Sequence, residues 1–215
     1  MTRLHVFDMD GTLLRGAASV ELSRHLGIFE IADTVERSWL AGEITDLDFW
    51  DTMLPLWAHA SEADIDAAFA AADWIDGVRE VFADIGRRGE IVAVISQSPH
   101  FFVRRLEGWG AHRTFGSRVL PGVATTRDVM LTPQHKVDIA RALLAEYGLG
   151  EDDCVAYGDS TSDVALFDHF THTVGVNSRE VLRPRAAVTY DGDDLREAYG
   201  LGRALVAAHR TSRIS

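Results

Sequence analysis

Short apolar runs recur along the chain, and each one ends in a cluster of small, polar or acidic residues. Runs at 4–7, 91–95 and 154–157 have this form, which is typical of strands buried inside a sheet. Two further strands are expected at 172–176 and 187–190. From residue 76 onward these runs alternate with helical patterns, which predicts parallel βαβ units with right-handed crossovers.

The pattern differs between Thr12 and Gly77, where no convincing strand occurs and apolar residues follow a helical spacing. Four helices are expected there, at about 17–26, 29–41, 45–57 and 61–72. We therefore predict an α/β fold with a Rossmann-like parallel sheet, helices on both faces and an inserted helical bundle. The predicted core comprises residues 1–15 and 76–215, and the insert comprises residues 16–75.

Composition narrows the class of protein. The 215 residues are 47% hydrophobic, which suits one core domain and a smaller insert. The single cysteine, Cys154, allows no internal disulfide. A net charge of -12 argues against nucleic acid or an anionic membrane as partner. The chain enters its first strand at once and has no bilayer-length apolar run, so we expect no signal peptide and a cytoplasmic location.

Two acids follow the first strand directly. Asp8 and Asp10 are two positions apart, so on an extended chain their side chains point the same way. Such closely spaced carboxylates repel unless a cation separates them or one takes a proton. The pair suits a hard divalent metal, a carboxylate nucleophile and a neighbouring acid or base, and Gly11 permits a tight turn beyond it.

The strand at 91–95 runs into Ser96, and we expect a helix soon afterwards. Ser98 suits the N-cap of that helix, and Pro99 suits its first turn. Free backbone N–H groups at such a helix start, together with the Ser96 hydroxyl, can bind an anion.

Two later segments supply a cation and more acids. Thr132 and a following proline predict the start of a helix that runs through Tyr147. Lys136 lies in its first turn, where a cation opposes the helix dipole, and this indicates an anionic partner. Beyond the strand at 154–157, Asp159 can complete the oxygen shell of a cation, and Asp163 can pair with Lys136.

In this order, the four motifs resemble those of the haloacid dehalogenase superfamily. The chain is most similar to its phosphoserine phosphatase-like branch (subfamily IB), which has a helical C1-type cap after the first motif. The matching motifs are Asp8-Met9-Asp10-Gly11-Thr12, Ser96, Lys136, and Gly158-Asp159 with Asp163.

The resemblance implies a Mg²⁺-dependent phosphatase acting through an aspartyl-phosphate. Asp8 would be the nucleophile, and Asp10 would protonate the leaving alcohol and then activate water. Asp10 also favours phosphate esters over halides, because an alkoxide needs a proton to leave. The implied phosphate-binding residues are Thr12, Ser96, Gln97 and Lys136. The implied metal ligands are Asp8, Asp159 and the main-chain carbonyl of Asp10, supported by Gly11 and Asp163. Mn²⁺ would suit the same oxygen ligands.

The insert departs from phosphoserine phosphatases where these bind their substrate. The family's glutamate for the substrate ammonium corresponds to Ala17, and Glu21 is the only acid nearby. The family's cap arginine has no counterpart, since residues 51–56 are not basic. We therefore hypothesise that phosphoserine is not the preferred substrate.

Other side chains are candidates for substrate contact. Trp50 and Trp57 either face the substrate cleft expected beside the insert or form the core of the insert. His100 either contacts the substrate or caps the loop that follows Ser96.

Three alternatives stay open beside this phosphatase. They are a phosphoserine phosphatase proper, a phosphotransferase or mutase, and a non-catalytic phosphate-binding protein of the same fold. The expected partner is a small phosphorylated metabolite, and the protein is expected to be a monomer or a homodimer.

Overall fold

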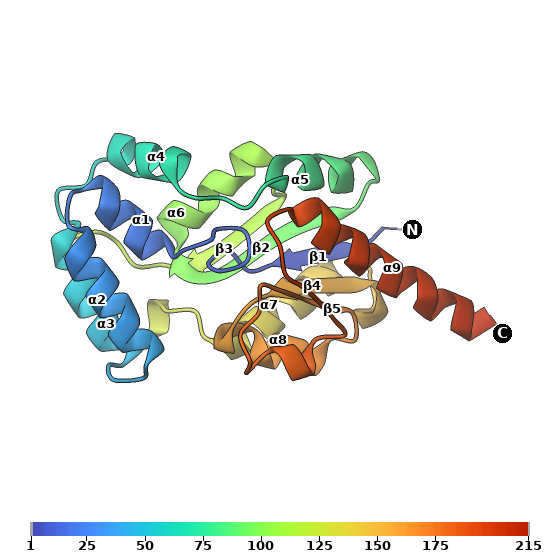
Figure 1. Ribbon diagram of the computed structural model, residues 1–215. Coiled ribbons are helices and arrows are strands. Elements are labelled where there is room, and N and C mark those ends of the chain that lie inside the picture. Colours follow the sequence, from blue (N-terminus) through green and yellow to red (C-terminus); the bar gives the residue numbers. More distant parts are fainter. Residues whose placement is uncertain (1, 215) are drawn as a thin grey trace.

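The computed structural model describes residues 2–214 and is built on a six-stranded parallel sheet (Figure 1). The strand order is β3-β2-β1-β4-β5-β6. The strands are β1 (Leu4–Phe7), β2 (Ile91–Pro99), β3 (Arg113–Ser117), β4 (Cys154–Gly158), β5 (Thr173–Val176) and β6 (Val188–Tyr190). Edge strand β3 was not predicted, because its sequence has no apolar run. The other five strands confirm the predicted α/β fold.

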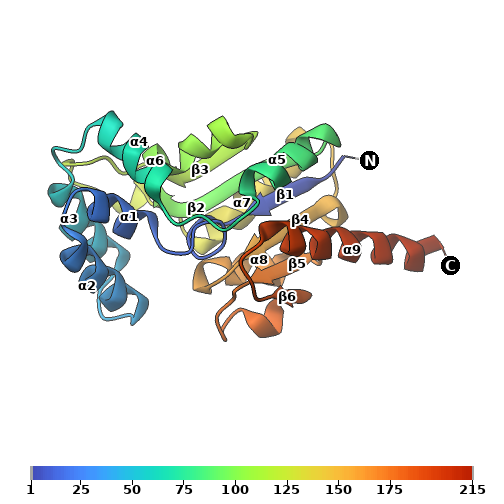
Figure 2. The ribbon, with the colours of Figure 1, turned by 45° about the horizontal axis from the view of Figure 1, so that its top comes forward.

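Helices cover both faces of the sheet, with α5 and α9 on one face and α7 and α8 on the other (Figure 2). None of the described helices is long and apolar enough to cross a membrane. The helices are α1 (Ala18–His25), α2 (Phe29–Leu40), α3 (Asp46–Leu56), α4 (Glu62–Ala71), α5 (Val78–Arg87), α6 (His100–Val103), α7 (Pro133–Glu146), α8 (Val164–His169) and α9 (Leu195–Ile214).

The two layers of the core follow from the alternation of side chains along each strand. Leu4 and Val6 of β1 pack in the layer with α7 and α8, whereas Phe7 packs in the layer with α5 and α9. Both layers are buried, so the central strands are apolar on both faces.

Helices α1 to α4 form an inserted segment whose two ends lie side by side where they join the core. The Ile75 N–H donates to the Leu13 carbonyl at 2.9 Å, and the Arg15 N–H donates to the Asp73 carbonyl at 2.9 Å. The four helices gather beyond one end of the sheet, and both chain termini lie at the opposite end (Figure 1). The predicted positions of these helices are confirmed to within two residues.

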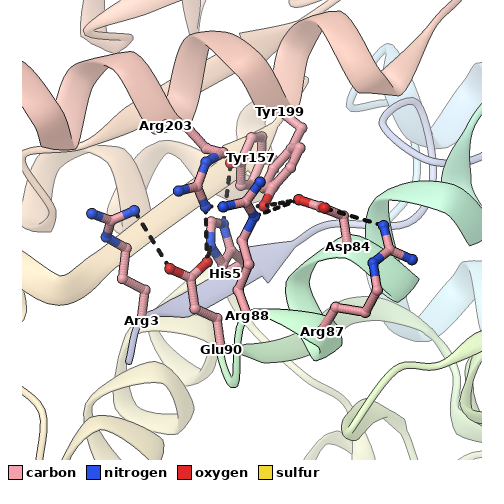
Figure 3. A network of polar contacts seen from close by, with 9 residues as sticks. All are labelled: Arg3, His5, Asp84, Arg87, Arg88, Glu90, Tyr157, Tyr199 and Arg203. Carbon is pink, nitrogen blue, oxygen red and sulfur yellow. Dashed lines mark hydrogen bonds and ion pairs between the residues drawn. The ribbon is translucent and has the colours of Figure 1, made fainter. Parts of the chain in front are cut away.

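A polar network closes the amino end of the sheet (Figure 3). His5 of β1 contacts Glu90 through Nε2 at 3.1 Å and the Tyr157 hydroxyl through Nδ1 at 3.2 Å. Arg203 of α9 donates to the same Glu90 oxygen at 3.1 Å, and Arg3 pairs with the other oxygen at 3.5 Å. Burial lowers the pKa of His5 below its usual value, so a neutral imidazole is favoured.

Candidate active site

Three buried carboxylates meet at the carboxyl ends of β1 and β4. Asp8 directly follows β1, and Asp159 directly follows its neighbour β4. Carboxylate oxygens of Asp8, Asp159 and Asp163 lie within 4.8 Å of one another. The structure therefore brings together the acids of the first and fourth motifs, as expected where parallel strands end side by side.

Lys136 lies directly against this acid cluster. Its ammonium is 2.7 Å from Asp163 Oδ1, 2.9 Å from Asp8 Oδ2 and 3.1 Å from Ser162 Oγ, and the side chain is buried. Burial disfavours its charge, but the carboxylates outweigh this and raise the pKa of Lys136. A capping box at Thr132 starts α7 and places Lys136 in the first turn. The carboxylates that pair with Lys136 come from other segments of the chain. Their charges explain why a cation is stable in the first turn of a helix.

Asp159 and Asp163 differ in how much of their hydrogen-bonding capacity is used. Asp163 Oδ2 accepts from the Asp159 N–H at 3.0 Å, and Lys136 occupies the other oxygen. Asp159 Oδ1 is buried and accepts no hydrogen bond within the described residues. Burial, followed by the charges of Asp163 and Asp8, holds the pKa of Asp159 well above its usual value. An unsatisfied buried carboxylate beside two others suits a cation.

Gly11 allows the turn after β1 to lie close against the Asp159 side chain. Its φ is +75°, and a Cβ there would overlap the Asp159 carboxylate. A larger residue would displace Asp159, so Gly11 supports the site through its small size.

Asp10 is held on the side facing the inserted helices. Its Oδ1 accepts from the Ala18 N–H at 3.0 Å, at the start of α1, and its Oδ2 accepts a short hydrogen bond from Ser98 Oγ. Burial raises the pKa of Asp10 to about 7, and the charges of Asp8 and Glu36 act in the same direction. A carboxyl that holds a proton near neutral pH is suited to general acid chemistry.

The segment after Ser96 differs from the prediction. Strand β2 continues through Pro99, and α6 starts at His100 without a side-chain cap. Ser98 is therefore not a helix N-cap, because its hydroxyl is bound to Asp10. Ser96 is buried, and its Oγ accepts from the Ser98 N–H at 3.1 Å.

Two adjoining cavities lie between the core and the inserted helices. The outer cleft has a volume of about 440 Å³ and is lined by Asp8, Ser96, Asp159 and residues of α1 and α2. The inner pocket is smaller and is lined mainly by residues of α2, α3 and the end of β2. Asp10, Glu36, Trp39 and Gln97 line both cavities, so these four residues lie where the cavities meet.

The remaining predicted phosphate-binding residues have different placements. Gln97 Nε2 donates to the Leu131 carbonyl at 2.9 Å, which fixes its side chain at the junction of the cavities. Thr12 is buried and does not line the outer cleft. It lines a neighbouring cavity together with Gly11 and Asp159.

Only one of the three substrate candidates lines a cavity beside the acids. Trp50 lines the inner pocket. Trp57 is fully buried, donates through Nε1 to Ser23 Oγ at 2.9 Å and packs against Phe101 of the core. His100 lies beside Thr114 in a separate groove. Of the two interpretations of Trp57, the structure therefore favours the core, and His100 lies away from the acids, because packing between distant segments turns both side chains from the cleft.

Three residues at the site were not assigned a role from the sequence. The Ser162 hydroxyl donates to Asp8 Oδ2 at 3.2 Å, and its place just before Asp163 was the available signal. Glu36 and Arg179 line the outer cleft from α2 and from the loop after β5. Neither of these two belongs to a sequence motif, so local patterns could not have found them.

Comparison with known proteins agrees with this geometry. A model of the haloacid dehalogenase-like hydrolases matches residues 5–168. A phosphoserine phosphatase of Methanocaldococcus jannaschii is 23% identical over 200 residues, covering 91% of this chain and 95% of the relative. A phosphoserine phosphatase of Wolinella succinogenes is 24% identical over 204 residues, covering 91% of this chain and 97% of the relative.

Solved structures show the same fold. A substrate-bound phosphoserine phosphatase superposes with a TM-score of 0.75 at 21% identity, covering 92% of this chain and 96% of the other. A hydrolase from Salmonella enterica serovar Typhi gives a TM-score of 0.78 at 19% identity, covering 91% of this chain and 70% of the other. The family match, the parallel sheet and the order of the four motifs establish that this chain belongs to the haloacid dehalogenase-like hydrolases, in their phosphoserine phosphatase-like branch.

Proposed function

We propose that this protein is a Mg²⁺-dependent phosphatase that hydrolyses a small phosphorylated metabolite through an aspartyl-phosphate on Asp8. The chain is a phosphoric monoester hydrolase by its family and relatives. The observation that carries the mechanism is the contact of Asp8 with Lys136 at 2.9 Å, inside a cluster of acids with Asp10 alongside. One carboxylate is thus held for attack while a second is held as an acid.

The acid cluster fits Mg²⁺. Asp8 and Asp159 present carboxylate oxygens within 4.8 Å, and Asp159 Oδ1 has no hydrogen-bond partner among the described residues. Both oxygens of Asp163 already accept hydrogen bonds, so Asp163 supports the site. Asp8, Asp159 and the main-chain carbonyl of Asp10 would hold the ion. When bound, Mg²⁺ supplies charge neutralisation for the phosphoryl oxygens.

The proposed reaction has two steps that use the same residues. An Asp8 oxygen forms a bond to phosphorus as the bond to the leaving alcohol breaks, and Asp10 gives its proton to the departing oxygen. Asp10 then takes a proton from water, which attacks the aspartyl-phosphate and releases phosphate and Asp8. Lys136 and Ser96 stabilise the negative charge that gathers on the phosphoryl oxygens. Thr12 and Gln97 were also expected to bind phosphate, and of the two only Gln97 lines the outer cleft with Asp8 and Asp10.

Residues 16–75 are proposed to act as a cap over a core formed by residues 1–15 and 76–215. The two ends of this segment are joined at Leu13 and Ile75, and its helices wall both cavities. A segment attached at one point can determine which substrates fit without changing the reacting groups.

Phosphoserine is the first substrate to compare, because the relatives bear that name. Ala17 and Glu21 both line the outer cleft, and Glu21 is 3.5 Å from Arg24. An acid with a cationic neighbour is a poorer partner for a substrate ammonium. We therefore keep the proposal that phosphoserine is not preferred.

The test is phosphate release from a panel of metabolite esters with Mg²⁺, using Asp8→Asn as the blank. We expect turnover by the unmodified protein and none by the variant, because an amide cannot form the acyl-phosphate. Retained activity in Asp8→Asn would contradict the mechanism. Transfer of phosphate to an added alcohol with little free phosphate would favour a phosphotransferase instead.

A further inference from the structure

The inner pocket is lined by acids and aromatic rings. Asp10, Glu36 and Asp46 supply three carboxylates, and the described residues that line it include no Lys, Arg or His. Its walls also contain the aromatic rings of Trp39, Phe49 and Trp50. Carboxylates and aromatic rings together are the groups that bind organic cations.

Neighbouring contacts hold these walls in place. Trp39 Nε1 donates to Asp46 Oδ1 at 2.6 Å, which fixes the indole between α2 and α3. The rings of Trp39 and Phe49 have centroids 5.8 Å apart, and those of Phe49 and Trp50 are 4.8 Å apart at 90°. Such edge and tilted contacts favour a defined arrangement of the rings.

Glu36 has a free acceptor in this setting. Ser19 Oγ donates to its Oε2 at 2.7 Å, while Oε1 makes no hydrogen bond or ion pair with the described residues. Glu36 lines both cavities, whereas its charged neighbours Arg179 and Asp33 line the outer cleft and not the inner pocket. A half-buried carboxylate with one oxygen unpaired would gain most from a cationic ligand.

The position of Asp10 indicates which part of the substrate can enter this pocket. As the acid, Asp10 must lie within hydrogen-bond reach of the leaving oxygen. It lines the pocket together with Ser98, to which it is hydrogen-bonded. Because Asp10 also lines the outer cleft, the substituent of the leaving alcohol lies at the junction of the two cavities, from which it can enter the inner pocket. The cavity volume of about 50 Å³ admits a small head group and excludes a nucleoside.

We propose that the released alcohol carries an ammonium group, which binds in the inner pocket to Glu36 and to the rings of Trp39, Phe49 and Trp50. This inference rests on the proposed phosphatase activity and names its substrate class: phosphate monoesters of small cationic alcohols. A carboxylate on the same alcohol would meet three acids in the pocket and no Lys, Arg or His among the described residues that line it. The proposal therefore separates a plain amino alcohol from phosphoserine.

The test compares two esters of equal size, 2-aminoethyl phosphate and the neutral 2-hydroxyethyl phosphate. We expect kcat/KM to favour the amino ester by about tenfold or more, as for a hydrogen bond to a charged group. The ratio should fall towards one in Glu36→Gln, which keeps the shape of the side chain. It should persist in Glu30→Gln, an exposed acid on the same helix. O-phosphoserine should have a lower kcat/KM than the amino ester.

Equal kcat/KM values for the two esters, or an unchanged ratio in Glu36→Gln, would overturn the proposal. If neither these esters nor p-nitrophenyl phosphate releases phosphate, the proposed function fails. The affinity of the inner pocket for the two esters is then measured by calorimetry. Tighter binding of the amino ester to the unmodified protein, lost in Glu36→Gln, would still support the pocket. Equal binding of both esters would refute it.

Discussion

Mg²⁺ should raise the melting temperature of the unmodified protein, and Asp159→Asn should lose most of that rise. Asp8, Asp159 and Asp163 lie within 4.8 Å, and Lys136 is the cation in contact with Asp8 and Asp163. Two like charges at 4.8 Å repel by about 3 kcal/mol at an effective dielectric constant of about 20. Lys136 offsets part of this repulsion and Mg²⁺ would offset more, and removing the charge of Asp159 relieves part of it as well.

The size of the effect follows from ligand linkage. At an Mg²⁺ concentration about 100 times Kd, binding stabilises the native state by about 2.7 kcal/mol. For a domain of this size, that corresponds to a rise in Tm of about 5 to 10 °C. Without Mg²⁺, Asp159→Asn should melt at or above the temperature of the unmodified protein.

Thermal unfolding followed by circular dichroism across an Mg²⁺ series measures both effects without relying on activity. Glu180→Gln, which changes an exposed acid in the loop after β5, is the matched control and should keep the full shift. The same Mg²⁺-dependent shift in Asp159→Asn would refute Asp159 as a ligand. No shift in the unmodified protein at 10 mM Mg²⁺, as about the highest useful concentration, would refute the site itself.

Three further outcomes are expected. Asp10→Asn should lower kcat by a factor of about 10² to 10⁴. Rapid-quench assays should show that both the formation and the hydrolysis of the aspartyl-phosphate are slower. Unchanged rates would contradict the acid–base role of Asp10. Lys136→Met should raise KM in steady-state assays. It should also lower the free energy of unfolding in urea by about 3 to 5 kcal/mol, because it leaves Asp8 and Asp163 without their cation in a buried site. Values equal to those of the unmodified protein would contradict this role of Lys136. Below pH 6.5, stability should fall, because the pKa of His5 is lowered in the folded state and the unfolded chain takes the proton first. Urea unfolding at pH 7.5 and about pH 5.5 should show a smaller loss in His5→Gln, and an equal loss would exclude His5 as a source.

The reacting groups could be predicted because they depend on local patterns. Asp8 and Asp159 each follow a buried apolar run, and parallel strands bring such ends to one edge of the sheet. The place of Lys136 in a helix start was equally visible from Thr132 and the following proline. Strand β3 was missed because an edge strand of mixed residues lacks the apolar run that signals a buried one.

The surroundings of these groups depended on contacts between segments far apart in the chain. Ser98 binds Asp10 across 88 positions, so its hydroxyl cannot cap a helix. For Trp57 and His100 the sequence left two interpretations open, and their contacts with Phe101 and Thr114 place both side chains away from the acids.

The fold class and the acids that meet at the site could be predicted from the sequence alone, because side-chain periodicity and strand ends are local properties. The side chains that wall the two cavities depend on how distant segments pack. Glu36 lines the inner pocket because α2, α3 and the end of β2 pack around one space. A cavity is bounded by several segments at once, and no single stretch of sequence records how the others pack against it.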